Sequence, residues 1–205
     1  YRMPVYVMPD TLKYAELRIE PELVYHMRPN EKTVIGSMTV LPFTKHHDAA
    51  DPVSFMVEYD GIRVGVFTDI GTVCKSVIHY FSQCHACFLE SNYDQQMLEA
   101  GSYPWHLKKR ISGGKGHLSN TQALELFLKH KPSYMSHLLL SHLSENNNHP
   151  AIVEELFTKH SGNVKIIVAP RTGETAVYKI ATPDEQRSEI IPMGVSKEVV
   201  QLAMF

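Results

Sequence analysis

The sequence predicts a layered α/β fold, on the evidence of three local patterns. Asp60-Gly61 lies between two apolar runs and is a strong signal for a two-residue hairpin turn, so the first half of the chain should contain paired strands. In the second half, Ser119 followed by Gln122 is a capping-box pattern that begins an amphipathic helix. A short apolar run at residues 138–140 then indicates a buried strand. Hairpins followed by alternating strands and helices are typical of layered α/β proteins.

The first half of the chain is predicted to consist mainly of strands. Turn signals at Pro9-Asp10 and Pro29-Asn30 separate the apolar runs. A polar loop that contains His47 precedes the hairpin. We expect a short helix at residues 12–17 and strands at residues 1–9, 22–28, 33–43, 53–59 and 62–68.

The second half is predicted to alternate between helices and strands. One helix carries Val73, Val77 and Phe81 at helical spacing, and two short helical pieces precede a basic segment. Pro150 is expected at the first position of a further helix, which Gly162 closes. The inward positions of the helices that follow Ser119 and Pro150 are Ala123, Leu124, Phe127, Leu128, Ile152, Val153, Leu156 and Phe157. Strands are expected at residues 86–89, 138–140, 164–168 and 175–180, and a terminal helix at residues 197–204.

Length and composition indicate one globular domain spanning residues 1–205, with a weakly patterned tail from about residue 182. Hydrophobic residues make up 43% of the chain, and 20 basic against 22 acidic residues give a net charge of −2, which provides no global attraction for nucleic acid or membrane. No apolar run approaches the roughly 18 residues of a membrane span, so no membrane partner is expected. The start has neither the charged residues nor the apolar core of a signal peptide. With three cysteines, a reducing cytoplasm is the expected location.

Cys84 and Cys87 have the CxxC spacing of redox pairs and half zinc sites. Because a second CxxC is missing from the sequence, ordinary free thiols beside a strand are the favoured interpretation.

Four polar residues recur at the ends of predicted strands or just before a helix: His47, Asp69, His117 and His142. Ligands of open α/β sheets bind at the carboxyl ends of the strands, where these residues are expected to meet. Neutral imidazoles suit zinc, iron or manganese, and a carboxylate can bridge two such cations. The pattern therefore indicates a metal site, although each histidine taken alone is better explained as a structural or solvent-exposed residue than as a ligand.

The order of these residues and their neighbours resembles the metallo-β-lactamase-fold hydrolases and, within them, the YycJ-like (WalJ-like) branch. Cyclic phosphate phosphodiesterases and tRNA 3′-processing endonucleases are related branches. The fold implied is an αββα sandwich. The resemblance covers about residues 1–180 and rests on the segments PF…HDA at residues 42–49, FTDIG at 67–71, ESN at 90–92, GHLSN at 116–120, and SHLS…NNHP at 141–150.

The resemblance assigns roles to individual residues. Asp69 falls on the bridging aspartate of the family, and His47 and His142 fall on metal-ligand histidines. His117 falls on the histidine that aids catalysis in the phosphodiesterase branches. The implied enzyme is a phosphodiesterase or exonuclease that acts on DNA, RNA or a nucleotide-like phosphodiester. It uses two divalent ions, zinc or manganese, and a hydroxide held between them attacks phosphorus.

Two further elements are expected to receive substrate phosphates. Lys108, Lys109 and Arg110 form a basic segment before His117, which either holds phosphate or is a solvated helix face. The helix N-terminus at Ser119 offers backbone N–H groups to an anion.

One departure from the family pattern is evident. The leading HxHxDH motif of the family is absent from the 205 residues, so the sandwich is expected to be incomplete at the amino terminus. The chain by itself is expected to lack the two metals, to be inactive, and to associate as a homo-oligomer through uncovered apolar surface. Two alternatives stay open, namely a lactonase or thioesterase on the same fold and a non-catalytic domain that retained it.

Overall fold

The structure is a computed structural model that describes residues 2–16 and 18–181. The terminal helix predicted at residues 197–204 lies outside the described residues. In the part of the chain that is described, no helix is long and apolar enough to cross a membrane.

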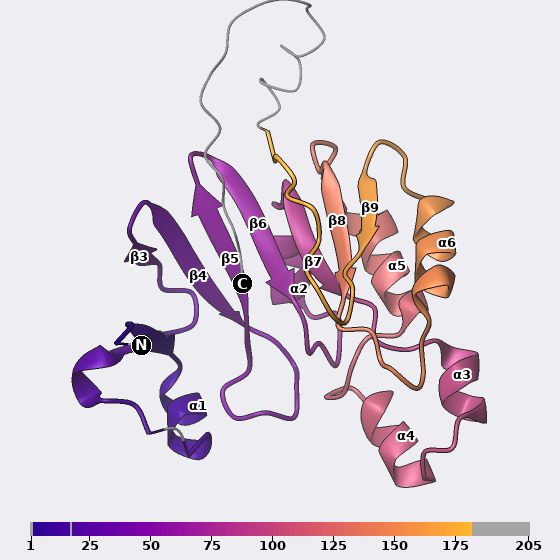
Figure 1. The fold of residues 1–205 in the computed structure, drawn as a ribbon, viewed down its shortest axis with the longest axis horizontal. Helices are drawn as coiled ribbons and strands as arrows, with labels where there is room; N and C mark the ends of the chain where they lie inside the picture. The colour runs from indigo at the N-terminus through magenta and orange to yellow at the C-terminus, as the bar shows by residue number, and fades with distance from the viewer. Residues whose placement is uncertain (1, 17, 182–205) are drawn as a thin grey trace, which may run out of the picture.

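A seven-stranded mixed sheet organises the molecule (Figure 1). Its strands follow the chain order without crossing, and the first four pair antiparallel while β6 to β9 are parallel. The strands are β3 (Thr33–Ile35), β4 (Met38–Thr44), β5 (Val53–Tyr59), β6 (Ile62–Phe67), β7 (Ala86–Glu90), β8 (His137–Ser141) and β9 (Lys165–Val168). A separate two-stranded parallel sheet joins β1 (Val5–Val7) to β2 (Val24–His26).

Helices connect the parallel strands and carry the predicted caps. The capping box is present, since the Ser119 hydroxyl accepts from the Gln122 N–H and the Gln122 side chain accepts from the Ser119 N–H. Pro150 occupies the first turn of its helix, as predicted. The helices are α1 (Pro9–Tyr14), α2 (Lys75–Phe81), α3 (Gln95–Ala100), α4 (Trp105–Ile111), α5 (Asn120–His130) and α6 (Pro150–Thr158), with a 3-10 turn at Pro21–Leu23.

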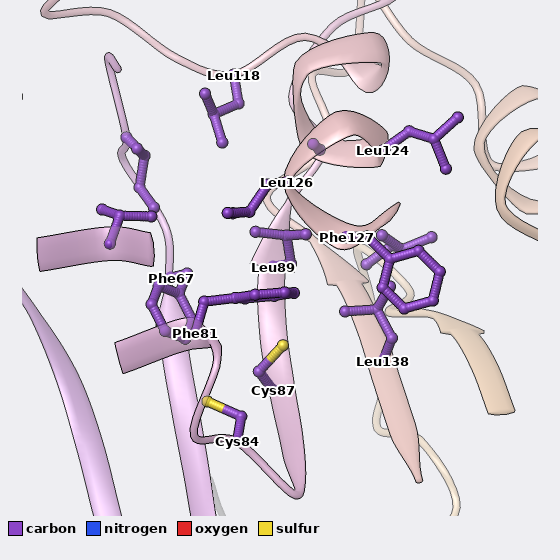
Figure 2. Close-up of a cluster of buried hydrophobic side chains, with 14 of the residues drawn as sticks. Phe67, Phe81, Cys84, Cys87, Leu89, Leu118, Leu124, Leu126, Phe127 and Leu138 are labelled. Atoms are coloured by element: carbon purple, nitrogen blue, oxygen red, sulfur yellow. The ribbon is translucent and has the colours of Figure 1, made fainter. Parts of the chain in front are cut away.

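The main core lies between one face of the sheet and α2, α5 and α6. Figure 2 shows Phe67 and Leu89 from the strands packed with Phe81 of α2 and Phe127 of α5, and all four side chains are fully buried. Burial of these large side chains removes apolar surface from water, which is the main stabilising contribution to such a core.

Cys84 and Cys87 lie in this core as free thiols, as predicted (Figure 2). Burial raises the pKa of the Cys87 thiol well above its usual value, so a reactive thiolate is disfavoured.

One sheet with helices on one face is half of the predicted αββα sandwich. The opposite face of the sheet presents Val57, Val64, Val66 and Phe88, which share that face by strand register and are only partly buried. The described residues therefore contain one sheet-and-helix layer, in agreement with a sandwich that is incomplete.

Four predicted elements differ from the structure. The strand expected at residues 33–43 is a hairpin, because Gly36 adopts a left-handed φ of 61° and reverses the chain between β3 and β4. Residues 175–180 form no strand and run as irregular chain. The first helix starts at Pro9, not at residue 12, and Val73 lies before α2 begins. The amphipathic faces were also misjudged at two positions, since Leu128 and Ile152 are 47% and 38% exposed.

Candidate metal centre

The carboxyl ends of β6, β7 and β8 lie level with one another and bring three polar side chains together. The strand register pairs Phe67 with Leu89 and Glu90 with Ser141. Asp69 follows β6 by two residues, Glu90 is the last residue of β7, and His142 is the first residue after β8. The predicted position of His142 at a strand end is confirmed.

The backbone turns sharply at Asp69 and His142. Both adopt left-handed conformations, with φ values of 55° and 57°, which side-chain-bearing residues seldom take. The turn after Asp69 is held by the Ile70 N–H, which donates to Glu90 Oε2 at 2.7 Å. Such backbone conformations cost free energy and persist where surrounding contacts hold them, often at functional sites.

His47 reaches the same point from the loop after β4. Its Nδ1 lies 3.0 Å from the carbonyl oxygen of Gly116, which can only accept, so Nδ1 carries the proton. Nε2 of the same ring faces Asp69, whose Oδ1 is 3.6 Å away. Its loop is fixed by the Gly71 N–H, which donates to the His46 carbonyl at 2.7 Å.

His117 is delivered by a close approach of the chain to α4. The His117 N–H donates to the Ile111 carbonyl at 2.8 Å, and a Cβ on Gly116 would lie 2.1 Å from that same oxygen. Only glycine fits at position 116 without moving the backbone. The imidazole of His117 lies between the other two, with ring centroids 5.2 Å from His47 and 5.1 Å from His142.

Glu90 holds two of the three imidazoles, and the sequence analysis did not assign it a role. Its fully buried carboxylate accepts from Nδ1 of His117 and from Nδ1 of His142 through Oε1, each at 2.7 Å. Burial raises the pKa of Glu90, but the hydrogen bonds from His117 and His142 outweigh it and hold the pKa below its usual range. Because the ionised carboxylate can only accept, each of these histidines keeps a proton on Nδ1 and directs Nε2 away from Glu90.

His142 also faces Asp69, with Nε2 3.6 Å from Oδ1. The hydrogen bond to Glu90 raises the pKa of His142, burial opposes this, and the charges of Glu90 and Asp69 add to the increase. A cation at Nε2 is therefore favoured by the surroundings, whether it is a proton or a metal ion.

Lys45 is a second residue without a predicted role. Its side chain is buried, with 7% of the residue exposed, and Nζ donates to the Thr68 carbonyl at 2.6 Å. Burial lowers the pKa of Lys45, while the charges of Asp69 and Glu90 raise it. The ammonium thus fixes the backbone directly before Asp69.

Buried amides hold the loop that carries His142. Asn92 Nδ2 donates to the His142 carbonyl at 2.8 Å, and Asn148 Nδ2 donates to the Ser91 and Asn92 carbonyls at 2.8 and 3.1 Å. Asn148 also bonds to the side chain of Asn120 at the start of α5. The loops after β7 and β8 and the start of α5 are therefore locked together, as expected for a rigid site.

The side chains fit a divalent cation. Ligand-capable atoms of Asp69, Glu90, His117 and His142 all lie within 4.8 Å of one another. Glu90 is already engaged with two imidazole N–H groups, which is the usual arrangement of a carboxylate that orients metal-binding histidines from behind. Imidazole nitrogen and carboxylate oxygen together suit zinc or manganese.

Among the residues expected to bind substrate, Arg110 contacts a neighbour of this centre. Arg110 Nε donates to Asp48 Oδ2 at 2.6 Å, next to His47, and Lys108 Nζ donates to the Glu99 carbonyl at 2.7 Å. Lys109 is exposed. Ser119 is 5% exposed and its hydroxyl is used by the helix cap, so its contact with substrate stays a prediction.

We expect the Glu90→Gln change to weaken metal binding by about 10- to 100-fold, the usual effect of removing a group that orients ligands from behind. A neutral amide cannot accept from both imidazoles and from the Ile70 N–H with equal strength. The measurement is a zinc or manganese titration of the complete protein, with a thermal unfolding curve to verify folding.

The matched control is Glu155→Gln, because Glu155 is an exposed carboxylate paired with Lys159 on α6. It should leave metal affinity unchanged. Equal affinities for the Glu90→Gln variant and the unaltered protein would show that Glu90 does not orient the ligands.

Two known bacterial proteins are similar to this chain in sequence. The exodeoxyribonuclease YycJ of Bacillus anthracis is 29% identical over 151 residues, which are 72% of this chain and 57% of YycJ. The exodeoxyribonuclease WalJ of Streptococcus pneumoniae serotype 2 is 31% identical over 113 residues, which are 55% of this chain and 42% of WalJ. The chain therefore spans about half the length of these relatives. No protein-family model matches the chain.

The fold is similar to that of solved structures. The metallo-β-lactamase fold protein YhfI of Bacillus subtilis superposes with a TM-score of 0.58 at 17% identity, over 81% of this chain and 61% of YhfI. The predicted fold and the predicted YycJ-like resemblance are both confirmed.

Proposed function

We propose that this chain, a YycJ-like sequence with the metallo-β-lactamase fold, forms the catalytic centre of a metal-dependent phosphodiesterase. One observation carries the proposal. Asp69 Oδ1 lies 3.6 Å from Nε2 of both His47 and His142. In both imidazoles Nδ1 is engaged elsewhere, by the Gly116 carbonyl and by Glu90. Two imidazole nitrogens that face one carboxylate oxygen form a donor set that suits divalent cations.

The residues divide into ligands and a catalytic group. His47 and His142 would hold the divalent cations together with Asp69, whose carboxylate faces both imidazoles. Divalent cations there supply Lewis-acid chemistry, since they withdraw charge from the phosphoryl group and bring the pKa of water toward about 7. His117, oriented by Glu90, donates a proton to the leaving oxygen or stabilises charge on the phosphoryl oxygens.

The substrate we propose is a nucleic acid. The last turn of α4 carries Lys108, Lys109 and Arg110, and clustered cations attract phosphates. The two relatives described above are exodeoxyribonucleases. The proposal also includes zinc or manganese as the metal and Ser119 as a phosphate contact. It further includes a cytoplasmic location, a single domain over residues 1–205 and homo-oligomers.

We expect the triple change Lys108→Gln, Lys109→Gln and Arg110→Gln to weaken polynucleotide binding and flatten its salt dependence. Loss of three phosphate contacts reduces the slope of log affinity against log salt by about 2 for a single strand. The measurement is binding of a labelled oligonucleotide at several salt concentrations, together with hydrolysis with and without a metal chelator.

The matched control replaces Lys129, Lys131 and Lys159, which lie at the far ends of α5 and α6, with glutamine. It should preserve the salt slope. Hydrolysis of a lactone or thioester that exceeds phosphodiester hydrolysis and ignores the triple change would establish the alternative enzyme. Metal binding with no hydrolysis of any of these would indicate the non-catalytic domain.

A further inference from the structure

Trp105 is the most exposed large hydrophobic side chain among the described residues, at 72%. It is the first residue of α4, and Lys109 one turn later places Nζ 4.8 Å from the centroid of the ring. The ammonium of the lysine thus lies over one face of the indole. An exposed tryptophan beside a cation contributes little to folding, because it removes little apolar surface from water.

A groove lies next to this ring, between α3 and α4. Its volume is about 540 Å³, within the range of small-molecule sites. Leu98, which is almost fully buried, forms an apolar floor. The other lining residues are Gln95, Glu99, Trp105, Lys108, Lys109 and Ser112.

Hydrogen bonds of α4 connect the wall of the groove to the loops of the candidate metal centre. Arg110 of α4 bonds to Asp48 beside His47, and the carbonyl of Ile111, the last residue of α4, accepts from the His117 N–H. Figure 1 shows α3 and α4 at the edge of the sheet toward which β6, β7 and β8 run, the edge that carries Asp69 and His142. A ligand chain bound along α4 would be held beside the site.

We propose that Trp105 and the α3–α4 groove bind an unpaired nucleobase of a single-stranded nucleic acid, with the α4 cations on the flanking phosphates. Base stacking on an aromatic ring within a cationic groove is how single strands are held without sequence preference. A duplex offers no free base face except at a frayed end, so the groove selects single strands. The inference rests on the proposed function for its substrate class.

Trp105 is the one tryptophan of the chain, so its fluorescence reports directly on this groove. The test titrates the 205-residue chain with a short oligothymidylate and compares an abasic oligonucleotide of equal length, which carries the phosphates alone. We expect saturable quenching by the oligothymidylate and little by the abasic strand or by a blunt duplex. Equal quenching by the abasic strand would overturn the proposal. An oligouridylate arm distinguishes RNA from DNA as the source of the base.

The Trp105→Ala variant should bind a labelled oligothymidylate about 5- to 150-fold more weakly, the usual effect of losing one stacked base. Tyr178→Ala is the matched control, because Lys165 lies 4.5 Å from the Tyr178 ring centroid in a similar pair at the amino end of β9. It should leave affinity within twofold. Unchanged affinity in a folded Trp105→Ala variant would refute the groove as a base site.

Different results would refute the proposed phosphodiesterase activity and the proposed base-binding groove. Quenching by oligothymidylate with no metal-dependent hydrolysis in the complete protein would refute the phosphodiesterase and leave the groove. Metal-dependent hydrolysis of bis(p-nitrophenyl) phosphate, without quenching by oligothymidylate, would refute the groove alone.

Discussion

Replacing Asp69 with asparagine is expected to remove bound metal and phosphodiesterase activity together from the complete protein. The carboxylate oxygen faces both His47 and His142, and a neutral amide oxygen cannot bridge two cations with comparable strength. The expected loss of turnover is at least about 10³-fold, since bound metal contributes several kcal/mol to transition-state stabilisation. Elemental analysis and a phosphodiester assay on the same preparation provide the measurement.

Asp48→Asn is the matched control for this change. Asp48 Oδ1 also lies 3.6 Å from His47 Nε2, but its second oxygen is bound to Arg110. The control should retain most of the metal. If the Asp69→Asn protein kept its metal and its turnover, Asp69 would not be a bridging ligand.

Replacing His117 with alanine is expected to lower turnover by about 10²- to 10⁴-fold with metal content preserved, the usual contribution of a positioned acid or base. The imidazole lies between His47 and His142 and is fixed by Glu90, so it can present Nε2 to a reacting group. The measurement pairs steady-state kinetics with metal analysis.

His106→Ala is the control, because His106 is an exposed histidine of α4. It should leave turnover unchanged. The atoms of His117 lie close enough to those of Asp69 for a ligand role. Loss of metal from the His117→Ala protein would therefore move His117 from the catalytic group to the ligand set.

Local patterns predicted the elements that depend on a few adjacent residues. The hairpin at Asp60-Gly61, with φ values of 47° and 77°, and the capping box at Ser119 are both present because each is decided within four residues. The hairpin turn at Gly36 was missed because the apolar residues on either side read as one continuous run. The strand expected at residues 175–180 depended on a neighbouring strand to pair with, which no local pattern specifies.

The sequence indicated some residues of the candidate site and not others. The order of motifs selected His47, Asp69, His117 and His142, which the structure brings together. Glu90 has no predicted role, although a polar residue at the predicted end of a buried strand is the same signal that indicates Asp69. Lys45 carries no such signal, because burial of a lysine depends on the carbonyl of Thr68, 23 residues away.

Because β6, β7 and β8 end at the same level, the register of these strands determines where the candidate metal ligands lie. Side chains alternate between the two faces of a strand, so sliding β7 by one residue against β8 would turn Glu90 away from His117 and His142. The positions of Glu90 and His142 relative to one another are therefore set by the pairing of β7 with β8.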